Sequence, residues 1–169
     1  MIICFVGKSG HGKSTAAQYL KSEIGATIIP FAKPLKKLAK QLGWDGVKDE
    51  KGRIILQNLG TEVCRNINPQ YWINSWVKTY KRKHPIITVV DDLRFENEMV
   101  LMKTMHAHII KIVKQQTWTQ RCLNKFKKVH PSEKGFKNNK CDFIITAGSK
   151  EELELQLSIF IRDTLYQQP

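Results

Sequence analysis

The feature that most constrains this chain is a phosphate-loop motif close to its N-terminus. Residues 7–14 read Gly-Lys-Ser-Gly-His-Gly-Lys-Ser and match the pattern G-x-x-x-x-G-K-[ST] at every fixed position. An apolar run precedes the motif and predicts a buried strand, and apolar residues recur at helical spacing from Ala16 to Ile24. Such a strand, turn and helix N-terminus form an anion site, because the loop N–H groups and the helix dipole face the same point. The motif therefore predicts binding of a nucleoside triphosphate.

Each position of the motif has an expected role in that site. Lys13 brings a full positive charge to the phosphates, and the hydroxyl of Ser14 is a suitable ligand for Mg²⁺. A helix that follows the loop is predicted to end at Gly25, where a C-cap glycine belongs. The residues expected to surround the triphosphate are Gly7, Lys8, Ser9, Gly10, His11, Gly12, Lys13, Ser14 and Thr15.

Length and composition limit the class of protein. The 169 residues give room for one domain with a real core, and a hydrophobic content of 41% excludes a disordered chain. No apolar run approaches the length of a membrane span, and no signal-peptide pattern precedes the first strand. The four cysteines contain no C-x-x-C pair, so we expect free thiols and a cytoplasmic location, that of the host cell if the source is viral.

The chain is strongly basic, with 28 Lys and Arg against 15 Asp and Glu and a net charge of +13. Such a charge suits polyanions, which include both nucleotides and nucleic acid. The basic residues concentrate in residues 114–140, where Glu133 is the single acid. A basic segment at this place is typical of a lid over phosphates, in which Arg121 would stabilise the transferred charge. The alternatives are a nucleic-acid-binding loop and a solvated one.

The pattern of apolar runs and turn residues predicts five strands that alternate with helices. This indicates a three-layer α/β domain with a five-stranded parallel sheet. A Ser-Lys-Glu-Glu capping box at 149–152 begins a long final helix with a stripe of Leu153, Leu157, Phe160, Ile161 and Leu165. The predicted strands are residues 1–6, 26–30, 86–92, 106–113 and 142–146, and the other predicted helices begin after the phosphate loop, at Pro34, at Arg53, at Pro69 with Asn68 as N-cap, near Leu93 and at Thr117.

The predicted helix from Arg53 to Arg65 carries an unusual polar stripe. Arg53, Gln57, Thr61 and Arg65 are spaced by four and therefore share one side. Gly60 lies in the middle, where it costs about 1 kcal/mol relative to alanine, which suggests that another group approaches the backbone there. Two guanidiniums with an amide between them can bind a phosphate and a base edge. The alternative is a solvated helix face.

The buried side of the same helix is predicted to consist of Leu56, Leu59 and Val63. In the next helix Trp72 and Trp76 are four residues apart, and we expect most of its aromatic residues to belong to the core. Trp72 is also a candidate to border a base.

The third predicted strand ends in two acidic residues. A phosphate-loop enzyme needs a carboxylate at the end of such a strand for the Mg²⁺ shell, and Asp91 and Asp92 compete for this role. Arg94 follows just beyond, at the crevice where open α/β sheets bind ligands. His106 and His108 are predicted to share a face of the fourth strand, and no third ligand for a metal is evident beside them.

Five strings of residues carry a family resemblance. They are Phe31–Lys36, Gly52 to Gln57, Gly60 to Arg65, Asp-Leu-Arg-Phe-Glu-Asn-Glu at 92–98 and His-Pro-Ser-Glu at 130–133. Together they resemble phage-type deoxynucleoside monophosphate kinases over nearly the whole chain. The string at 92–98 and the arginine-bearing helix are the most specific parts. The chain departs from the family at Lys33, where an acidic residue is common, and at 146–149, where Thr-Ala-Gly-Ser replaces Asn-Asp-Gly-Ser.

The resemblance implies transfer of the γ-phosphoryl group of ATP, with Mg²⁺, to a deoxynucleoside 5′-monophosphate. It also implies one kinase domain over residues 1–169. The core would comprise residues 1–30, 84–113 and 141–169, the acceptor-binding helical insert residues 31–83, and the lid residues 114–140.

The resemblance also assigns roles to individual residues. Lys13, Arg94, Asp92 and the lid residue Arg121 would be catalytic, and Ser14 with Asp92 would order the metal and its waters. The residues implied for the acceptor are Arg53, Arg65 and Arg94 at its phosphate, Gln57, Thr61 and Trp72 at its base or sugar, Lys33 and Gly60 beside it, and His130 and Glu133 from the lid.

Two alternative functions and one loss of function are compatible with the same motifs. Animal phosphomevalonate kinases share a similar phosphate loop, Asp-x-Arg string and basic lid, so the acceptor could be a small phosphorylated alcohol. A nucleic-acid-binding ATPase would explain the charge, but the chain lacks the further arginine and sensor regions of a motor. We therefore expect no nucleic-acid partner. We also expect no membrane association and a homodimer. A chain that binds without catalysis is disfavoured, because Lys13, Ser14 and Asp92 are present.

Overall fold

The structure is a computed structural model that describes residues 1–47, 49–115, 136–137 and 140–165. The chain divides into two compact units. The first comprises Met1–Ile28 and Ile86–Pro169, and the second Ile29–Pro85. Within the described residues, no helix has both the length and the apolar character needed to cross a membrane.

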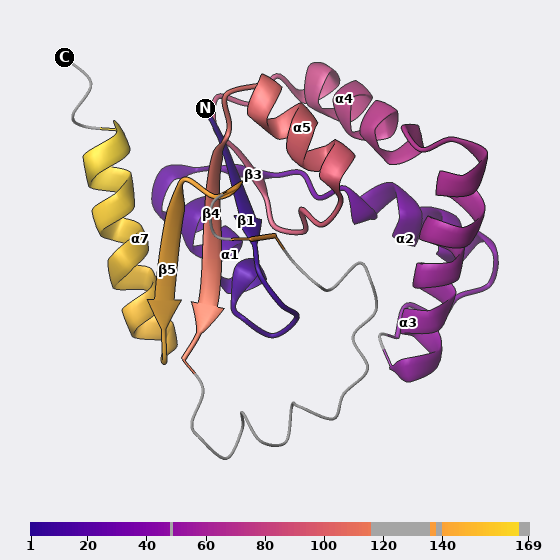
Figure 1. Cartoon of the computed structure of the whole chain (residues 1–169), viewed down its shortest axis with the longest axis horizontal. Helices are drawn as coiled ribbons and strands as arrows, with labels where there is room; N and C mark the ends of the chain where they lie inside the picture. The colour runs from indigo at the N-terminus through magenta and orange to yellow at the C-terminus, as the bar shows by residue number, and fades with distance from the viewer. Residues whose placement is uncertain (48, 116–135, 138–139, 166–169) are drawn as a thin grey trace. The chain divides into compact units, whose positions relative to one another are not determined.

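The first unit is built on a parallel sheet of five strands (Figure 1). Its strands lie in the order β2-β3-β1-β4-β5, so the strand that leads into the phosphate loop is central. Every residue of this central strand is buried, as its unbroken apolar sequence predicts for a parallel sheet covered on both faces. The strand bounds are Ile2–Val6 for β1, Thr27–Ile28 for β2, Thr88–Val90 for β3, His108–Lys114 for β4 and Phe143–Ala147 for β5.

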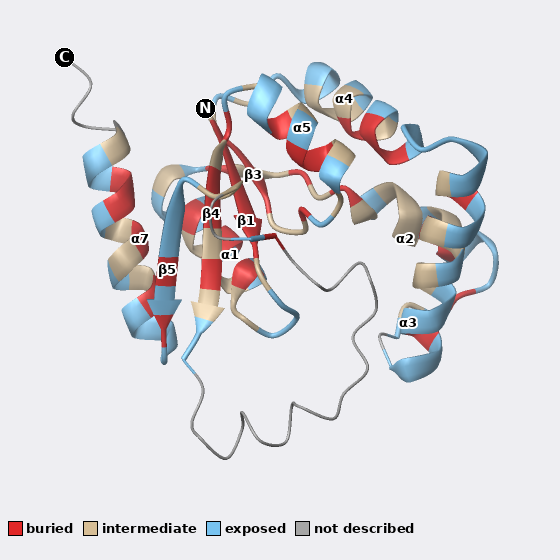
Figure 2. Ribbon diagram, in the orientation of Figure 1, coloured by how far each residue is buried: buried red, intermediate tan, exposed pale blue. Residues whose placement is uncertain are grey.

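Helices cover both faces of this sheet. Helix α1 (Lys13–Ile24) and helix α7 (Lys150–Leu165) share a core with Ile3 and Phe5 of β1. Since side chains alternate along a strand, Cys4 faces the other side, toward helix α5 (Glu96–Thr104). Burial first, and then the carboxylates of Asp92, Asp142 and Glu98, raise the pKa of the Cys4 thiol. Figure 2 shows the buried inner surfaces of these layers, and the predicted α/β fold with a five-stranded parallel sheet is confirmed.

The ends of two helices follow the sequence signals. Helix α1 ends at Gly25, which has the left-handed φ of 63° that favours glycine. At the start of α7 the N–H of Glu152 donates to Oγ of Ser149 at 3.1 Å, and the N–H of Gly148 donates to the Glu152 carboxylate at 2.8 Å. The predicted capping box is therefore present, except that the Glu152 carboxylate accepts the N–H of Gly148 in place of the N–H of Ser149. The predicted stripe of α7 is buried at Leu153, Leu157, Phe160 and Ile161, and the side chain of Leu165 lies outside the described part.

The described residues of the second unit contain four helical segments. They are α2 (Ala32–Gln41), α3 (Glu50–Gln57), the π-helix η1 (Asn58–Arg65) and α4 (Tyr71–Lys83). Trp76 of α4 lies at its centre, stacked between Phe31 at 5.4 Å and Tyr80 at 5.1 Å. Its indole N–H donates to the carbonyl of Ile29 at 2.7 Å, so the predicted core role of Trp76 is satisfied in both its apolar and its polar parts.

Several predicted element starts were wrong by a few residues. Helix α2 begins at Ala32, two residues before Pro34, and α5 begins at Glu96 rather than near Leu93. The predicted cap Asn68 instead accepts the N–H of Gln70 at 2.9 Å, which closes a turn before α4 begins at Tyr71.

Strand bounds were also imprecise. Strands β2 and β3 are shorter than predicted, because only Thr27–Ile28 and Thr88–Val90 form ladder pairs. His106 does not share a strand face with His108, since it lies after α5 with a left-handed φ of 53°.

The prediction of one α-helix from Arg53 to Arg65 was wrong in its second half. The chain changes from α3 to the π-helix η1 at Asn58. A π-helix has i→i+5 hydrogen bonds, so the wider turn rotates later residues away from the positions that α-helical spacing assigns. For this reason Val63, which was predicted to be buried, is 46% exposed, while Cys64 is buried.

Candidate active site

The phosphate loop has a backbone that requires glycine. Gly7 has a φ of 143° and Gly12 a φ of 92°, both in the range that favours glycine. A Cβ atom on Gly7 would also collide with the carbonyl oxygen of Ile112 on β4. The loop is therefore pressed against the neighbouring strand at its first residue and turns directly into α1 at its last glycine.

Lys13 lies folded into this loop. Its ammonium donates to the carbonyls of Gly7 and Lys8, both at 2.8 Å, and the residue is only 9% exposed. The loop thus wraps around one cation at the N-terminus of α1, where the helix dipole adds further positive potential. This arrangement attracts an anion and holds its main charge in a fixed place.

His11 joins the phosphate loop to the end of β4. Its Nδ1 lies 3.2 Å from the carbonyl oxygen of Ile112 and 3.3 Å from the backbone nitrogen of Lys114. A protonated Nδ1 donates to the former, and an unprotonated Nδ1 accepts from the latter. Burial is the main cause that lowers the pKa of His11; the Ile112 carbonyl opposes it, and the charges of Lys13, Lys8 and Lys114 add to it.

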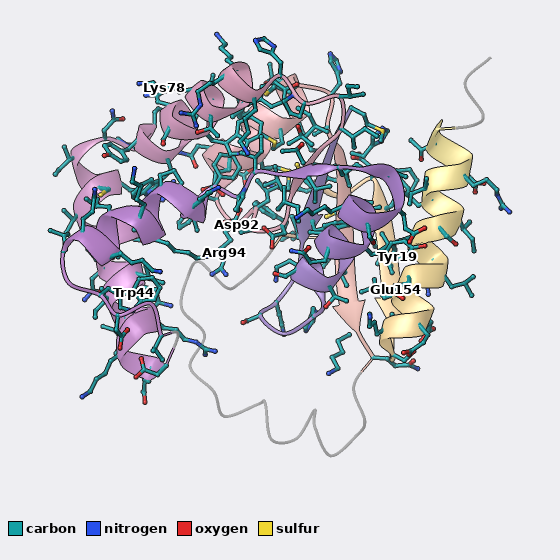
Figure 3. All side chains as sticks on the ribbon, turned by 180° about the vertical axis from the view of Figure 1, so that it is seen from behind. Tyr19, Trp44, Lys78, Asp92, Arg94 and Glu154 are labelled. Atoms are coloured by element: carbon teal, nitrogen blue, oxygen red, sulfur yellow. The ribbon has the colours of Figure 1, made fainter. Side chains whose placement is uncertain are left out.

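The carboxylate of Asp91, the first residue after β3, reaches the first turn of α1. The hydroxyl of Ser14 donates to Oδ2 of Asp91 at 2.8 Å, which places a hydroxyl and a carboxylate oxygen together beside the phosphate loop. Asp92 follows, and its side chain and that of Arg94 extend from the loop between β3 and α5 (Figure 3). Hydroxyl and carboxylate oxygens are ligands that Mg²⁺ prefers, so the residues present fit a magnesium ion.

The same loop contains a residue whose role sequence reasoning missed. Glu98 is 1% exposed, and its Oε2 accepts the backbone N–H groups of Arg94 at 3.0 Å and Phe95 at 3.1 Å. Arg94 itself is exposed. The signal was present in the sequence, because Glu98 is the last residue of the string at 92–98, but its position at the third residue of a helix resembles an ordinary cap.

The polar stripe of the second unit begins on a firmly held helix end. The carboxylate of Asp49 accepts the N–H of Gly52 at 2.7 Å, and a side chain on Gly52 would collide with the carbonyl of Val47. The indole of Trp44 donates to that same carbonyl at 3.0 Å. The start of α3, from which the exposed side chain of Arg53 projects, is therefore tightly packed at Gly52.

The rest of the stripe lies at the junction of α3 and η1. Gln57, Thr61 and Arg65 are half-buried, unlike Arg53. The group that approaches the backbone at Gly60 is protein, because a Cβ there would lie 2.8 Å from a methyl of Leu35, and the carbonyl of Gly60 accepts the indole N–H of Trp72 at 3.0 Å. Trp72 is 3% exposed, so its observed contacts are those of a core residue that supports η1.

Four further predicted site residues belong to the basic segment and to α2. Arg121, His130 and Glu133 lie outside the described residues. Lys33 is exposed near the start of α2. Near the end of the basic segment, the carbonyl of Phe136 accepts a hydrogen bond from the ammonium of Lys111 at 2.6 Å, and Lys140 pairs with Glu96 of α5.

Comparison with known proteins decides the family. The sequence model of the deoxynucleotide monophosphate kinase family matches residues 48–157. The chain belongs to the deoxynucleotide monophosphate kinase family. It is also 30% identical over 144 residues to a protein of Acanthamoeba polyphaga mimivirus named "Putative deoxynucleotide monophosphate kinase", an alignment that covers 66% of this chain and 73% of the viral protein. The predicted resemblance is thereby confirmed, and the chain is a phosphotransferase.

The fold agrees with that membership. The crystal structure of shikimate kinase from Aquifex aeolicus matches with a TM-score of 0.55 and 15% identity, covering 99% of this chain and 100% of that one. At this level of identity the match shows the fold alone. A deoxynucleotide monophosphate kinase of this fold thus has its phosphate loop after the central strand, where open α/β sheets bind nucleotides.

Proposed function

We propose that the chain transfers the γ-phosphoryl group of ATP to a deoxynucleoside 5′-monophosphate. The observation that carries this proposal is the phosphate loop folded around the buried ammonium of Lys13, in a chain of the deoxynucleotide monophosphate kinase family. An oxygen of the acceptor phosphate attacks the γ-phosphorus, and the bond from that phosphorus to the β–γ bridging oxygen breaks. The products are a deoxynucleoside diphosphate and ADP.

The ATP side of the site belongs to the first unit. The loop N–H groups at residues 7–15 bind the phosphates, and Lys13 exchanges its carbonyl partners for phosphate oxygens. Because the second pKa of a phosphate monoester is about 6, the acceptor is already ionised near neutral pH and needs no general base. The protein therefore contributes positioning and neutralisation of charge, which is what phosphoryl transfer requires.

The metal side of the proposal concerns Ser14 and the two carboxylates after β3. The hydroxyl of Ser14 would bind Mg²⁺, and Asp92 would order its waters. The hydrogen bond from Ser14 to Asp91 makes Asp91 a second candidate for that role. Mg²⁺ in such sites usually keeps several waters and takes further oxygens from the substrate phosphates. When bound, the ion neutralises developing charge on the transferred group.

The acceptor side draws on three arginines. Arg94 projects from the loop after β3, and Arg53 and Arg65 belong to the arginine-bearing helical segment that the family resemblance identifies. Guanidinium groups bind phosphate oxygens in pairs, which fixes the orientation of the acceptor as well as its position. Gln57 and Thr61 remain proposed contacts to base or sugar, with Lys33 beside them, and Trp72 would act by supporting η1.

The lid residues complete the proposal. Arg121 would stabilise the transferred charge, while His130 and Glu133 would shape the segment or contact nucleotide. We also propose that the chain forms a homodimer and acts in the cytoplasm, that of the host cell if the source is viral.

The test is an ADP-release assay with ATP and Mg²⁺, run separately with dAMP, dCMP, dGMP, dTMP and the matching ribonucleotides. We expect turnover with at least one deoxynucleotide. Silence with all of them would contradict the proposal, and phosphomevalonate and then single- and double-stranded DNA are the compounds to add next.

A matched pair of lysine variants on α1 shows whether turnover comes from this site. Lys13→Met is expected to lower kcat by about 10²-fold or more, because it removes the charge at the phosphates. Lys21→Met removes the same charge from the exposed end of the helix and is expected to leave kcat within about two-fold. Equal activity of the two variants would assign the turnover to another site.

A further inference from the structure

We propose that Glu98 is a positioning residue for Arg94, whose guanidinium it presents to the acceptor phosphate by holding the backbone of the β3–α5 loop. The proposal rests on the proposed function, from which it takes the role of Arg94. It adds a link between the buried carboxylate of Glu98 and the exposed guanidinium of Arg94, which lies four residues earlier in the sequence.

The side chain of Glu98 is buried. Three polar or charged side chains are buried among the described residues, namely Lys13, Thr88 and Glu98. Removing a carboxylate from water is costly unless hydrogen bonds replace the lost hydration. Both backbone N–H groups that Glu98 accepts belong to the loop that ends at α5, so the carboxylate and this loop stabilise each other.

The backbone at Arg94 is held on both sides. Leu93 is 2% exposed and anchors the loop in the core on one side. On the other side the N–H of Arg94 is held by Glu98, and Phe95 begins α5 by accepting the N–H of Met99 at 3.0 Å. The backbone of Arg94 is therefore fixed from both directions, while its side chain is exposed.

The guanidinium of Arg94 is available to bind a ligand. In the described part of the chain, no hydrogen bond or ion pair to the guanidinium of Arg94 occurs. A charged group on a fixed backbone, next to the carboxylates after β3, can bind an anion with less loss of freedom than one on a mobile loop. Glu98 thus supplies preorganisation and makes no contact with the phosphate itself.

Glu98 accepts one N–H group more than a capping box requires. In a capping box an acidic residue at the third helical position accepts one N–H, that of the N-cap residue. Here the N-cap is Phe95, and the carboxylate accepts the N–H of Arg94 in addition. The carboxamide oxygen of Asn97 accepts the N–H of Glu98 at 3.0 Å and so caps the same turn.

The test compares kcat/KM for the deoxynucleotide acceptor with KM for ATP in Glu98→Leu, Glu98→Gln, Arg94→Ala and the double variant. Glu98→Leu removes the carboxylate that accepts the two backbone N–H groups. It is expected to lower kcat/KM for the deoxynucleotide about ten-fold or more, as for a lost hydrogen bond to a charged group. Glu98→Gln keeps one oxygen that can accept both N–H groups and is expected to retain activity within about three-fold. KM for ATP is expected to change less than about two-fold in each variant, because the phosphate loop is unaltered.

The double variant separates positioning from simple stability. If Glu98 acts through Arg94, Glu98→Leu is expected to lower kcat/KM by less than about two-fold in the Arg94→Ala background. Met102→Ala, a fully buried change on the same helix, is the control for lost stability and is expected to leave KM for the acceptor unchanged. Should Glu98→Leu not fold, Glu98→Asp, which draws the oxygens back by one methylene, replaces it in the same cycle.

Three results would overturn the inference. Additive losses from Glu98→Leu and Arg94→Ala would show that Glu98 acts independently of Arg94. An acceptor KM raised equally by Met102→Ala would reduce Glu98 to a stabilising residue. Full activity of Arg94→Ala with the acceptor would remove Arg94 from the proposed site and the inference with it, while turnover of deoxynucleotides in the unaltered protein would still support the proposed function.

Discussion

The hydroxyl of Ser14 donates a 2.8 Å hydrogen bond to Oδ2 of Asp91, although the two residues are 77 positions apart in the sequence. The contact joins the first turn of α1 to the end of β3 within the central part of the sheet. It orients the Ser14 hydroxyl before any ligand arrives. If Ser14 binds Mg²⁺ as proposed, Asp91 affects that site even without contacting the ion, because such outer contacts orient the ligands.

This relationship leads to a prediction about magnesium. We expect Asp91→Asn to raise the Mg²⁺ concentration for half-maximal activity about ten-fold or more, the usual cost of losing an outer-shell partner. Asp92→Asn is expected to raise it as well, and the larger of the two shifts identifies the carboxylate that orders the metal shell. The measurement is a magnesium titration of initial rates at saturating ATP. Asp163→Asn on α7 is the charge-matched control, and unchanged titrations for both loop variants would contradict the metal assignment.

Gly7 is predicted to be irreplaceable for stability. Gly7→Ala combines an unfavourable φ with a collision against the Ile112 carbonyl, so we expect a loss of about 2–4 kcal/mol in the free energy of unfolding. Gly25→Ala has a left-handed φ but open space around the new Cβ, and about 1–2 kcal/mol is expected. Chemical denaturation of both variants gives the comparison. Equal losses would show that backbone conformation alone matters at Gly7.

His11 is predicted to make stability depend on pH. Because its pKa is lower in the folded chain, the unfolded chain binds more protons in the interval below about 6.5, and stability falls as the pH decreases through that interval. Below the lowered pKa of the folded state the effect levels off. Denaturation midpoints measured from neutral to mildly acid pH are expected to show a smaller decrease in His11→Asn than in the unaltered chain.

The control for this prediction is His84→Asn. His84 has a left-handed φ of 42°, which asparagine tolerates, so this variant removes a histidine without new strain. It is expected to retain the pH dependence of the unaltered chain. If His11→Asn retains it too, another group is responsible.

The indole N–H of Trp72 is predicted to matter for the acceptor. Trp72→Phe leaves the carbonyl of Gly60 without its donor, at a cost of about 1–3 kcal/mol, and loosens the π-helix that carries Thr61 and Arg65. Trp76→Phe removes an equivalent bond, to Ile29, and serves as the control. Both variants are expected to lower the free energy of unfolding, but only Trp72→Phe is expected to raise KM for the deoxynucleotide. If Trp72→Phe and Trp76→Phe have equal KM values for the deoxynucleotide, η1 has no specific role in acceptor binding.

Much of the first unit could be predicted because its signals are local. The phosphate loop needs glycine and lysine at fixed spacing, and the apolar run of β1 indicates a strand covered on both faces. The choice between Asp91 and Asp92 could not be made, because it depends on where β3 ends. Pairing with β1 stops at Val90, and that depends on the neighbouring strand.

The π-helix and Glu98 lay beyond sequence reasoning for a different reason. Nothing local distinguishes residues 58–65 from an α-helix, and the wider turn is accompanied by Leu35 and Trp72 packing against Gly60. An acidic residue at the third position of a helix normally remains in solvent, so the burial of Glu98 follows only from the packing of α5 on the sheet. In both cases contacts distant in sequence override the local pattern.

The central position of β1 has a consequence for how the first unit opens. Its residues pair with β3 on one side and β4 on the other, so its amide protons should exchange with solvent only when the whole sheet comes apart. The phosphate loop continues from that strand without a linker. A bound nucleotide therefore opposes unfolding of the whole sheet rather than local fraying. Proteases should cleave this unit less often as the nucleotide concentration rises.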